Sequence, residues 1–273
     1  MTKLLPWSEE GNWHTLFGGR TNAAWQVVGP ENEVPAVLKL YRSEAENPLF
    51  PNDPRAEATM LQHLQGQDIA PNLIAAFSVE NMDCNLYHAL DGERWTAGVF
   101  EVAQLIQRLH AVRPPSGLRQ SANGTEAIMA QASSILAAAG AELELPSGLE
   151  LISVPPSKKT VLLHCDIVPG NLIQGSDGLR LIDWQCPAIG DASEDLAVFL
   201  SPAMQLLYRG EPLSLEEENS FLTSFSQDQQ NRFRALAPAY HYRMAAYCLW
   251  QMSRGRMEYE DALQVELAAL NRS

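Results

Sequence analysis

Residues 161–184 constrain the fold of this chain more than any other part of the sequence. Three polar residues, Asp166, Asn171 and Asp183, stand between short apolar runs that are typical of strands. The runs predict a strand that enters a loop, and then a hairpin that turns at 175–178 and ends at Asp183. Because such a hairpin folds Asp183 back toward the loop, we expect carboxylate and amide oxygens to gather there. These oxygens are the ligands that suit Mg²⁺.

Each of these polar residues also has an ordinary structural interpretation. Asp and Asn are common in turns, where they hydrogen-bond their own backbone, so Asp166 alone indicates little. The complete pattern is more specific, because H-x-D-x-x-x-x-N runs from His164 to Asn171 and a hairpin then leads to an apolar run that ends in Asp183. This is the spacing of the catalytic loop and the metal-binding aspartate in kinase-type phosphoryl transfer.

The same stretch resembles the aminoglycoside phosphotransferase and choline kinase superfamily, whose loop reads H-G-D-x-x-x-x-N and whose metal motif is I-D-W or I-D-F. The two motifs stand here at 164–171 and 182–184, and residues 190–197 match the family's G-D-x-x-x-D-L-A. The sequence departs from the family at two loop positions, with Cys165 where Gly is usual and Val168 where many members have His. The resemblance extends over roughly residues 14–200.

The resemblance implies an α+β fold with the two lobes of a protein kinase. A small nucleotide-binding lobe, residues 1–90, would contain an antiparallel sheet and one main helix, and a larger, mostly helical lobe, residues 91–273, would carry catalysis and substrate binding. It also implies ATP and Mg²⁺ as cofactors. Asp166 would accept or orient the proton of the acceptor hydroxyl, and Asn171 and Asp183 would hold the metal.

A glycine turn near the N-terminus is a candidate for phosphate binding. Gly18 and Gly19 allow a close approach of the backbone, whose N–H groups can face phosphates, although most double glycines are plain hairpin turns. Members of the family often carry G-G-x-T-N here, and Gly18, Gly19, Thr21 and Asn22 fit that motif. The resemblance therefore adds Gly18, Gly19 and Asn22 to the nucleotide-binding candidates.

Residues 35–41 predict a strand that contains Lys39. Such a lysine either points to water from an edge strand or binds phosphates, as the lysine of V-A-I-K does, and its place between the glycine turn and the next helix favours phosphate binding. Asp53 is the predicted N-cap of that helix. Glu57 lies in the first turn of that helix, where a favourable interaction with the helix dipole is enough to account for it. In kinases, however, a glutamate at this place forms an ion pair with the phosphate-binding lysine, which would be Lys39 here.

The resemblance places the adenine-binding hinge at the end of the small lobe. Main-chain groups of His88, Ala89 and Leu90 would hydrogen-bond the base there, so His88 is not expected to act as a catalyst.

The rest of the chain reads as helical. Residues 125–145 predict a helix broken near Gly140, and Ser214 with Glu217 predicts a capping box at a later helix start. Three aromatic residues share one helical face and are interpreted as core rather than as a cage for a quaternary ammonium, namely Tyr240, Tyr247 and Trp250.

Composition limits the partners of the chain. A net charge of −14 disfavours nucleic acid and anionic membranes, and it either attracts a cationic small molecule or only confers solubility. The four cysteines form no C-x-x-C pair, no long apolar run is present, and the N-terminus lacks a signal peptide, so we expect a cytoplasmic protein. Only eleven residues separate Asp183 from Asp195, which leaves no room for the activation segment of a protein kinase and favours a small substrate.

The sequence therefore predicts an ATP-dependent phosphotransferase that moves the γ-phosphoryl group to a hydroxyl of a small molecule such as an amino alcohol, thiamine, an amino sugar or a sugar. The alternative is a nucleotide-binding regulatory protein of the same fold without turnover. A zinc site at His164-Cys165 is disfavoured, since no second His/Cys pair stands at a zinc spacing. The acceptor, the oligomeric state and the choice between ATP and GTP stay open.

Overall fold

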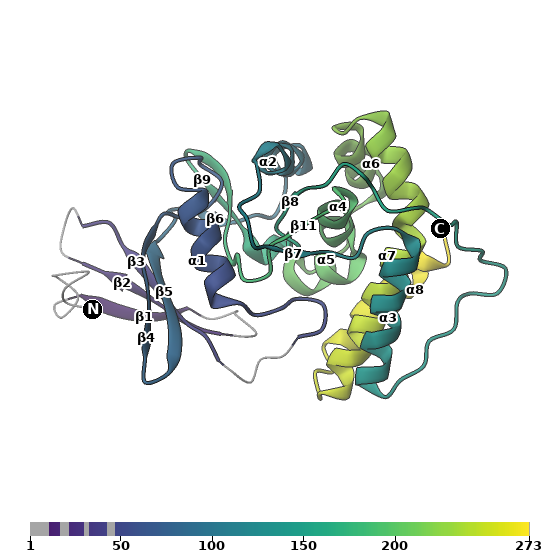
Figure 1. Cartoon of the computed structure of the whole chain (residues 1–273), viewed down its shortest axis with the longest axis horizontal. Helices are drawn as coiled ribbons and strands as arrows, with labels where there is room; N and C mark the ends of the chain where they lie inside the picture. Colours follow the sequence, from purple (N-terminus) through teal and green to yellow (C-terminus); the bar gives the residue numbers. More distant parts are fainter. Residues whose placement is uncertain (1–10, 17–21, 30–32, 43–46, 273) are drawn as a thin grey trace. The chain divides into compact units, whose positions relative to one another are not determined.

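The computed structural model describes residues 11–16, 22–29, 33–42 and 47–272. The chain divides into two compact units: unit 1 is Met1–Arg94 with Asn171–Pro187, and unit 2 is Trp95–Gly170 with Ala188–Ser273. The predicted fold class is confirmed, because unit 1 is built on an antiparallel sheet with one main helix and unit 2 is mostly helical (Figure 1). The predicted boundary between the two functional lobes at residue 90 stays a prediction. The compact unit 1 also includes Asn171–Pro187, the segment that contains the hairpin.

The main sheet of unit 1 has five antiparallel strands. Glu80 and Asn81, both with positive φ, form the turn between its last two strands in sequence. A small apolar core on the sheet gathers around Ala36 and Leu86, which are fully buried. In spatial order the strands are β1 (Asn12–Leu16), β2 (Ala23–Val28), β3 (Ala36–Leu40), β5 (Met82–His88) and β4 (Leu73–Val79).

The main helix of unit 1 is α1 (Pro54–His63), and it begins where the sequence predicts. The Asp53 side chain accepts two backbone N–H hydrogen bonds from the first turn, at 2.9 and 3.0 Å. Pro54 occupies the first helical position, where its missing N–H costs no hydrogen bond. The helix buries Glu57, Met60 and Leu61, so a carboxylate lies on its otherwise apolar inner face.

A second, three-stranded sheet of unit 1 contains the predicted hairpin. Its strands are β9 (Leu172–Gly175) and β10 (Gly178–Leu181), and β9 also pairs with β6 (Glu93–Arg94). The hairpin register pairs Leu172 with Leu181, so the residues that precede β9 and follow β10 meet at the open end.

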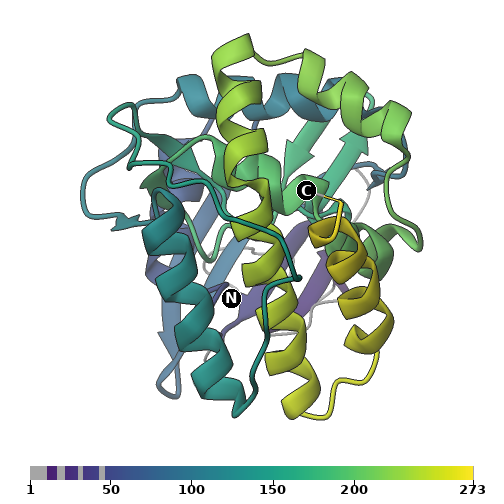
Figure 2. The ribbon, with the colours of Figure 1, turned by 90° about the vertical axis from the view of Figure 1, so that its right-hand side faces the viewer.

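Unit 2 is built around the long helix α7 (Gln227–Ser253), which α3 (Thr125–Ala139) and α8 (Tyr259–Leu270) flank (Figure 1 and Figure 2). A small sheet joins β8 (Val161–Leu163) to β11 (Ala188–Gly190) in antiparallel fashion and β11 to β7 (Arg119–Gln120) in parallel fashion. The helices are α2 (Val99–Ala111), α3 (Thr125–Ala139), α4 (Ser193–Leu200), α5 (Pro202–Arg209), α6 (Leu215–Thr223), α7 (Gln227–Ser253) and α8 (Tyr259–Leu270).

Two expectations for these helices have clear outcomes. The predicted helix at 125–145 does not resume after Gly140, because Gly140 adopts a left-handed conformation (φ 62°) and caps α3 with its backbone N–H. The capping box at α6 is confirmed, since the Ser214 side chain accepts the Glu217 N–H and the Glu217 side chain accepts the Ser214 N–H.

The aromatic residues of α7 belong to the core. Tyr240, Tyr247 and Trp250 are all buried, and the Tyr247 and Trp250 rings stack at 5.7 Å between centroids. Core packing, the preferred interpretation of the sequence, therefore holds. Within the part of the chain that the structure describes, no helix combines the length and apolar character needed to cross a membrane.

Candidate active site

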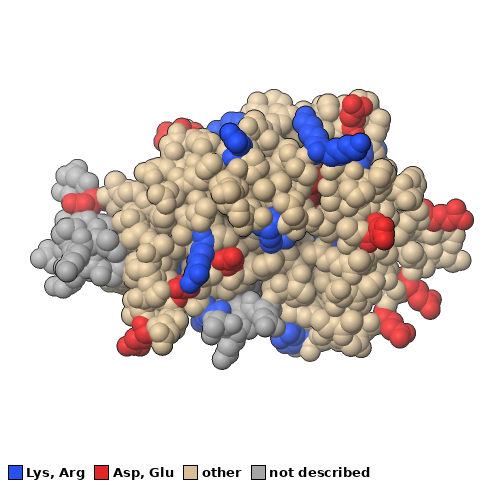
Figure 3. Space-filling model, in the orientation of Figure 1, with Lys and Arg blue, Asp and Glu red and all other residues tan. Residues whose placement is uncertain are grey.

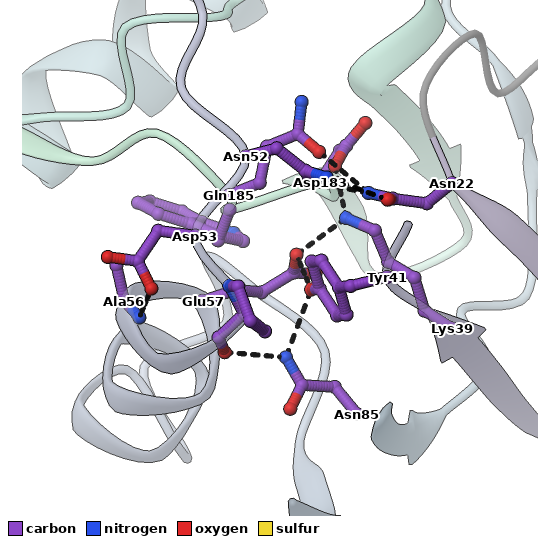
Figure 4. A network of polar contacts seen from close by, with 12 residues as sticks. Asn22, Lys39, Tyr41, Asn52, Asp53, Ala56, Glu57, Asn85, Asp183 and Gln185 are labelled. Atoms are coloured by element: carbon purple, nitrogen blue, oxygen red, sulfur yellow. Dashed lines mark hydrogen bonds and ion pairs between the residues drawn. The ribbon is translucent and has the colours of Figure 1, made fainter. Parts of the chain in front are cut away.

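Lys39 lies between two carboxylates in unit 1 (Figure 4). Its Nζ is 2.5 Å from Glu57 Oε2 and also donates to Asp183 Oδ1. Lys39 is 5% exposed and Glu57 is 1% exposed, so the lysine does not point to water. The contact with Glu57 is the ion pair that the resemblance implies.

The charges of this group depend on one another. Burial alone would lower the pKa of Lys39, but the carboxylates of Asp183 and Glu57 outweigh it and raise that pKa well above its usual range. Burial raises the pKa of Glu57, while the ammonium group of Lys39 opposes the change. Lys39 is therefore a fixed, buried positive charge on β3.

Tyr41 and Asn85 complete the surroundings of Glu57, and sequence reasoning missed both. The Tyr41 hydroxyl donates to Glu57 Oε2, and Asn85 Nδ2 donates to the Tyr41 hydroxyl oxygen at 3.0 Å and to the Pro54 carbonyl at 2.9 Å. Burial, and then the nearby Glu57 carboxylate, raise the pKa of Tyr41, so the phenol stays a donor. The sequence did hold a signal for Tyr41: side chains two residues apart in a strand point to the same face of the sheet, so Tyr41 shares a face with Lys39.

The two predicted metal ligands meet at the open end of the hairpin in unit 1. The Ile182 N–H donates to the Asn171 carbonyl at 2.9 Å, which continues the β9–β10 ladder by one residue on each side. Asp183 follows directly, with a left-handed backbone (φ 65°) that turns it out of the strand direction. Local pairing therefore places Asn171 and Asp183 at the same end of the hairpin, and their role as metal ligands stays a prediction.

The donor set at this end suits a hard cation. A carboxylate and a side-chain amide offer oxygen ligands, and Mg²⁺ is usually held by one or two protein ligands together with water and substrate phosphates. Over residues 11–272, apart from the gaps already named, no group of three or more His, Cys, Asp or Glu side chains is arranged to hold a metal. The residues thus fit a cation that a nucleotide helps to bind, rather than a closed metal cage.

The predicted catalytic residue Asp166 lies in unit 2, on the loop after β8. Its N–H donates to His164 Nδ1 at 3.2 Å, and His164 is fully buried. Asp195, in the first turn of α4, accepts the N–H groups of His164 and Cys165 at 3.2 and 2.8 Å and lies 3.0 Å from His110 Nε2. A buried carboxylate therefore holds the loop backbone in place, and His164 and His110 have structural partners.

Cys165, which replaces the usual glycine of the loop, has a left-handed backbone with φ 65°. Few residues other than glycine adopt this conformation without strain, which explains why Gly is usual there. The Cys165 side chain is buried, and burial raises the pKa of its thiol well above the usual range. The thiol is therefore a neutral core group.

The glycine-turn candidates have different outcomes. Gly18 and Gly19 lie outside the described residues. Asn22 is described, and its side-chain amide hydrogen-bonds the side chains of Asn52 and Gln185 at 2.8 and 3.0 Å. Asn22 therefore contacts two residues that the sequence did not single out.

The hinge candidates lie at the end of β5. The N–H of His88 donates to the Asn72 carbonyl at 3.0 Å, and the N–H of Ala89 donates to the Pro35 carbonyl at 2.8 Å. In an antiparallel pair, two facing residues normally exchange two N–H···O hydrogen bonds. Because Pro35 has no N–H, it cannot donate the second of these bonds to the Ala89 carbonyl. The N–H groups of His88 and Ala89 are thus already used within the protein. The candidates for binding adenine at the hinge are therefore the carbonyl groups of this segment and the main chain of Leu90.

Two buried acidic residues of unit 2 are paired with arginines. Arg243 forms a two-point contact with Glu194, at 2.6 and 3.1 Å, and both side chains are buried. Arg232 contacts Asp191 at 2.6 Å. On the face that Figure 3 shows, acidic and basic side chains of the described residues are interspersed. The net negative charge therefore does not collect into one patch on that face.

Comparisons with known proteins identify the family and the fold of the chain. A model of the phosphotransferase enzyme family matches residues 13–228. No curated protein matches the sequence. A choline/ethanolamine kinase family protein from Mesorhizobium loti has a TM-score of 0.67 at 12% identity, over 99% of this chain and 91% of that chain.

Two further solved structures have the same fold. An ethanolamine kinase from Plasmodium vivax has a TM-score of 0.63 at 14% identity, over 99% of this chain and 84% of its own. A spectinomycin phosphotransferase, solved in complex with ADP and spectinomycin, has a TM-score of 0.59 at 13% identity, over 99% of this chain and 92% of its own. At such identities the likeness is one of fold, and it confirms the predicted kinase-like architecture.

Proposed function

Since the chain belongs to the phosphotransferase enzyme family and is a small-molecule phosphotransferase, we propose that it transfers the γ-phosphoryl group of ATP to a hydroxyl of a small molecule. The observation that carries the proposal is the buried Lys39, held between Glu57 and Asp183. A buried lysine with two carboxylate partners is a preformed positive charge, and phosphoryl transfer depends mainly on positioning and on stabilising negative charge.

Residues of unit 1 are proposed to hold the donor. Lys39, oriented by Glu57, neutralises charge on the phosphates. The backbone carbonyls near His88 and the main chain of Leu90 bind the adenine, and Gly18 and Gly19 line the phosphates. Asn171 and Asp183 hold Mg²⁺, which when bound supplies positive charge to the phosphate oxygens.

Asp166 is proposed to act on the acceptor. Its carboxylate orients the hydroxyl and takes its proton as the hydroxyl oxygen forms a bond to the γ-phosphorus. The bond between that phosphorus and the bridging oxygen breaks, and ADP leaves with the electron pair. Asp195 and His164 support this role, because they hold the backbone that carries Asp166.

The acceptor is proposed to be a hydroxylated amine. A net charge of −14 favours the approach of cations, and two of the structural neighbours are described as acting on ethanolamine or spectinomycin. Amino alcohols and amino sugars therefore stand first among the candidate acceptors, ahead of thiamine and neutral sugars.

The test is an ADP-release assay with Mg-ATP and a panel of amino alcohols, aminoglycosides, thiamine and sugars. We expect Asp166→Ala to fold and bind Mg-ATP but to lose transfer by about 10²–10⁴-fold, the usual contribution of a general base. Asp177→Ala is the matched control, because Asp177 lies exposed in the hairpin turn. Retained turnover in Asp166→Ala would remove this residue from the mechanism. Binding of Mg-ATP without ADP release for any acceptor would refute the proposed reaction for this panel.

A further inference from the structure

Three side-chain amides of unit 1 form one hydrogen-bonded group, which we call the amide cluster: Asn22, Asn52 and Gln185 (Figure 4). Asn22 and Asn52 donate to each other's side-chain oxygen, at 2.8 and 2.9 Å. Asn22 also donates to Gln185 Oε1 at 3.0 Å. The cluster thus joins residues separated by as many as 163 positions in the sequence.

The hydrogen-bonding capacity of Asn22 is used within the protein. A side-chain amide has two N–H donors and an oxygen with two lone pairs. The two donors of Asn22 go to Asn52 and Gln185, and its Oδ1 accepts from Asn52 Nδ2 and from the Arg42 N–H. A phosphate could take a bond from this side chain only if the cluster opened.

The members of the cluster stand next to the segments that carry the nucleotide site. Asn22 directly precedes β2, Asn52 directly precedes the N-cap of α1, and Gln185 lies two residues after Asp183. Gln185 is 4% exposed, and its backbone carbonyl accepts the Asp53 N–H at 3.0 Å. The start of the helix that carries Glu57 is therefore tied to the segment that carries Asp183.

We infer that Asn22 and Gln185 are positioning residues for the nucleotide, and that Asn22 acts through the amide cluster rather than as a phosphate ligand. This inference rests on the proposed function. The cluster holds the start of β2, the start of α1 and the Asp183 segment in one arrangement before the nucleotide binds. Without it, the same arrangement must be formed on binding, and the affinity falls accordingly.

A double-mutant cycle tests the inference, with Asn22→Ala, Gln185→Met and the double variant. Two quantities are measured at a temperature where every variant is folded: the dissociation constant for Mg-ATP by calorimetry, and the free energy of unfolding of the nucleotide-free protein. We expect each single variant to weaken Mg-ATP binding by about tenfold, and the double variant to be no weaker than about the worse single one, because both break one unit.

Gln230→Met is the matched control. Gln230 is a buried glutamine of unit 2, and it donates to the Phe225 carbonyl at 2.9 Å. Its loss should lower stability without changing the affinity for Mg-ATP, which separates positioning of the nucleotide from general destabilisation.

Two outcomes would overturn the inference. If Gln185→Met left the affinity unchanged while Asn22→Ala abolished binding, Asn22 would be a direct ligand. If the two effects multiplied in the double variant, the residues would act independently. A wild-type protein that bound no Mg-ATP would instead overturn the proposed function, and the unfolding cycle would still decide whether the amides act as one unit.

Discussion

The backbone of Cys165 is joined to the side chain of Asp195 by a hydrogen bond in which the Cys165 N–H donates to Oδ1 at 2.8 Å. The other carboxylate oxygen accepts the His164 N–H at 3.2 Å. Asp195 is fully buried, so these N–H groups would have no alternative partner in water if the carboxylate were removed. The conformation of the loop that carries Asp166 therefore depends on a residue of α4.

Asp195→Ala should destabilise the protein by about 2–5 kcal/mol, because it leaves buried backbone donors unsatisfied, and should also reduce phosphoryl transfer. Asp195→Asn keeps one acceptor oxygen and should lose less of both. Urea unfolding and ADP release measure the two effects. Asp228→Ala, an exposed aspartate at the start of α7, is the control. Wild-type stability of Asp195→Ala would show that the loop does not depend on this carboxylate.

Cys165 offers a direct measurement of backbone strain. At its φ of 65°, we expect Cys165→Gly to be more stable than Cys165→Ala by about 1 kcal/mol, because glycine tolerates the left-handed conformation. Cys84, a buried cysteine in β5, is the control position. There the Cys84→Ala variant should be more stable than the Cys84→Gly variant by about 0.5–1 kcal/mol. Equal stability of the two Cys165 variants would mean that the left-handed backbone carries no strain there.

The Tyr41 hydroxyl is expected to hold Glu57 in the orientation that it needs for Lys39. Tyr41→Phe keeps the ring but removes a hydrogen bond to a buried carboxylate, so it should cost about 1.5–3 kcal/mol and weaken Mg-ATP binding. Tyr242→Phe is the control, because the Tyr242 hydroxyl donates to a neutral carbonyl, that of Leu143. Unfolding and calorimetry on both variants compare them. If Tyr41→Phe bound Mg-ATP as tightly as the wild type, the Tyr41 hydroxyl would play no part in nucleotide binding.

Glu217 should contribute stability that depends on pH. The hydrogen bond from Arg209 lowers the pKa of Glu217 below its usual value, against the opposing effect of burial. A lowered pKa in the folded state means that this stability is present above the unfolded pKa, about 4.3, and is lost as the pH falls through the folded value. The stability difference between the wild type and Glu217→Gln should therefore shrink as the pH falls below the unfolded pKa of Glu217. Urea unfolding at several pH values measures it, with the exposed Glu216→Gln as control. A difference that stayed constant with pH would contradict the assignment.

Local features of the site followed from the sequence because neighbouring residues decide them. The turn at 175–178 and the strand period of two place Asn171 and Asp183 at one end of a hairpin, and the register confirms this placement. The N-cap at Asp53 and the capping box at Ser214 depend on residues two or three positions away. The helix predicted to extend to 145 failed for a local reason too, since Gly140 ends it in a left-handed conformation.

The sequence by itself determined which residue types stand at which spacings, and hence the family, the fold class and the candidates Lys39, Asp166, Asn171 and Asp183. Only the tertiary structure decided the partners of these residues. Tyr41 reaches Glu57 across 16 positions, Asp195 reaches Cys165 across 30, and Gln185 reaches Asn22 across 163. The physical reason is that motifs describe what is close along the chain, whereas buried polar groups take their hydrogen-bond partners from whatever the packing brings near.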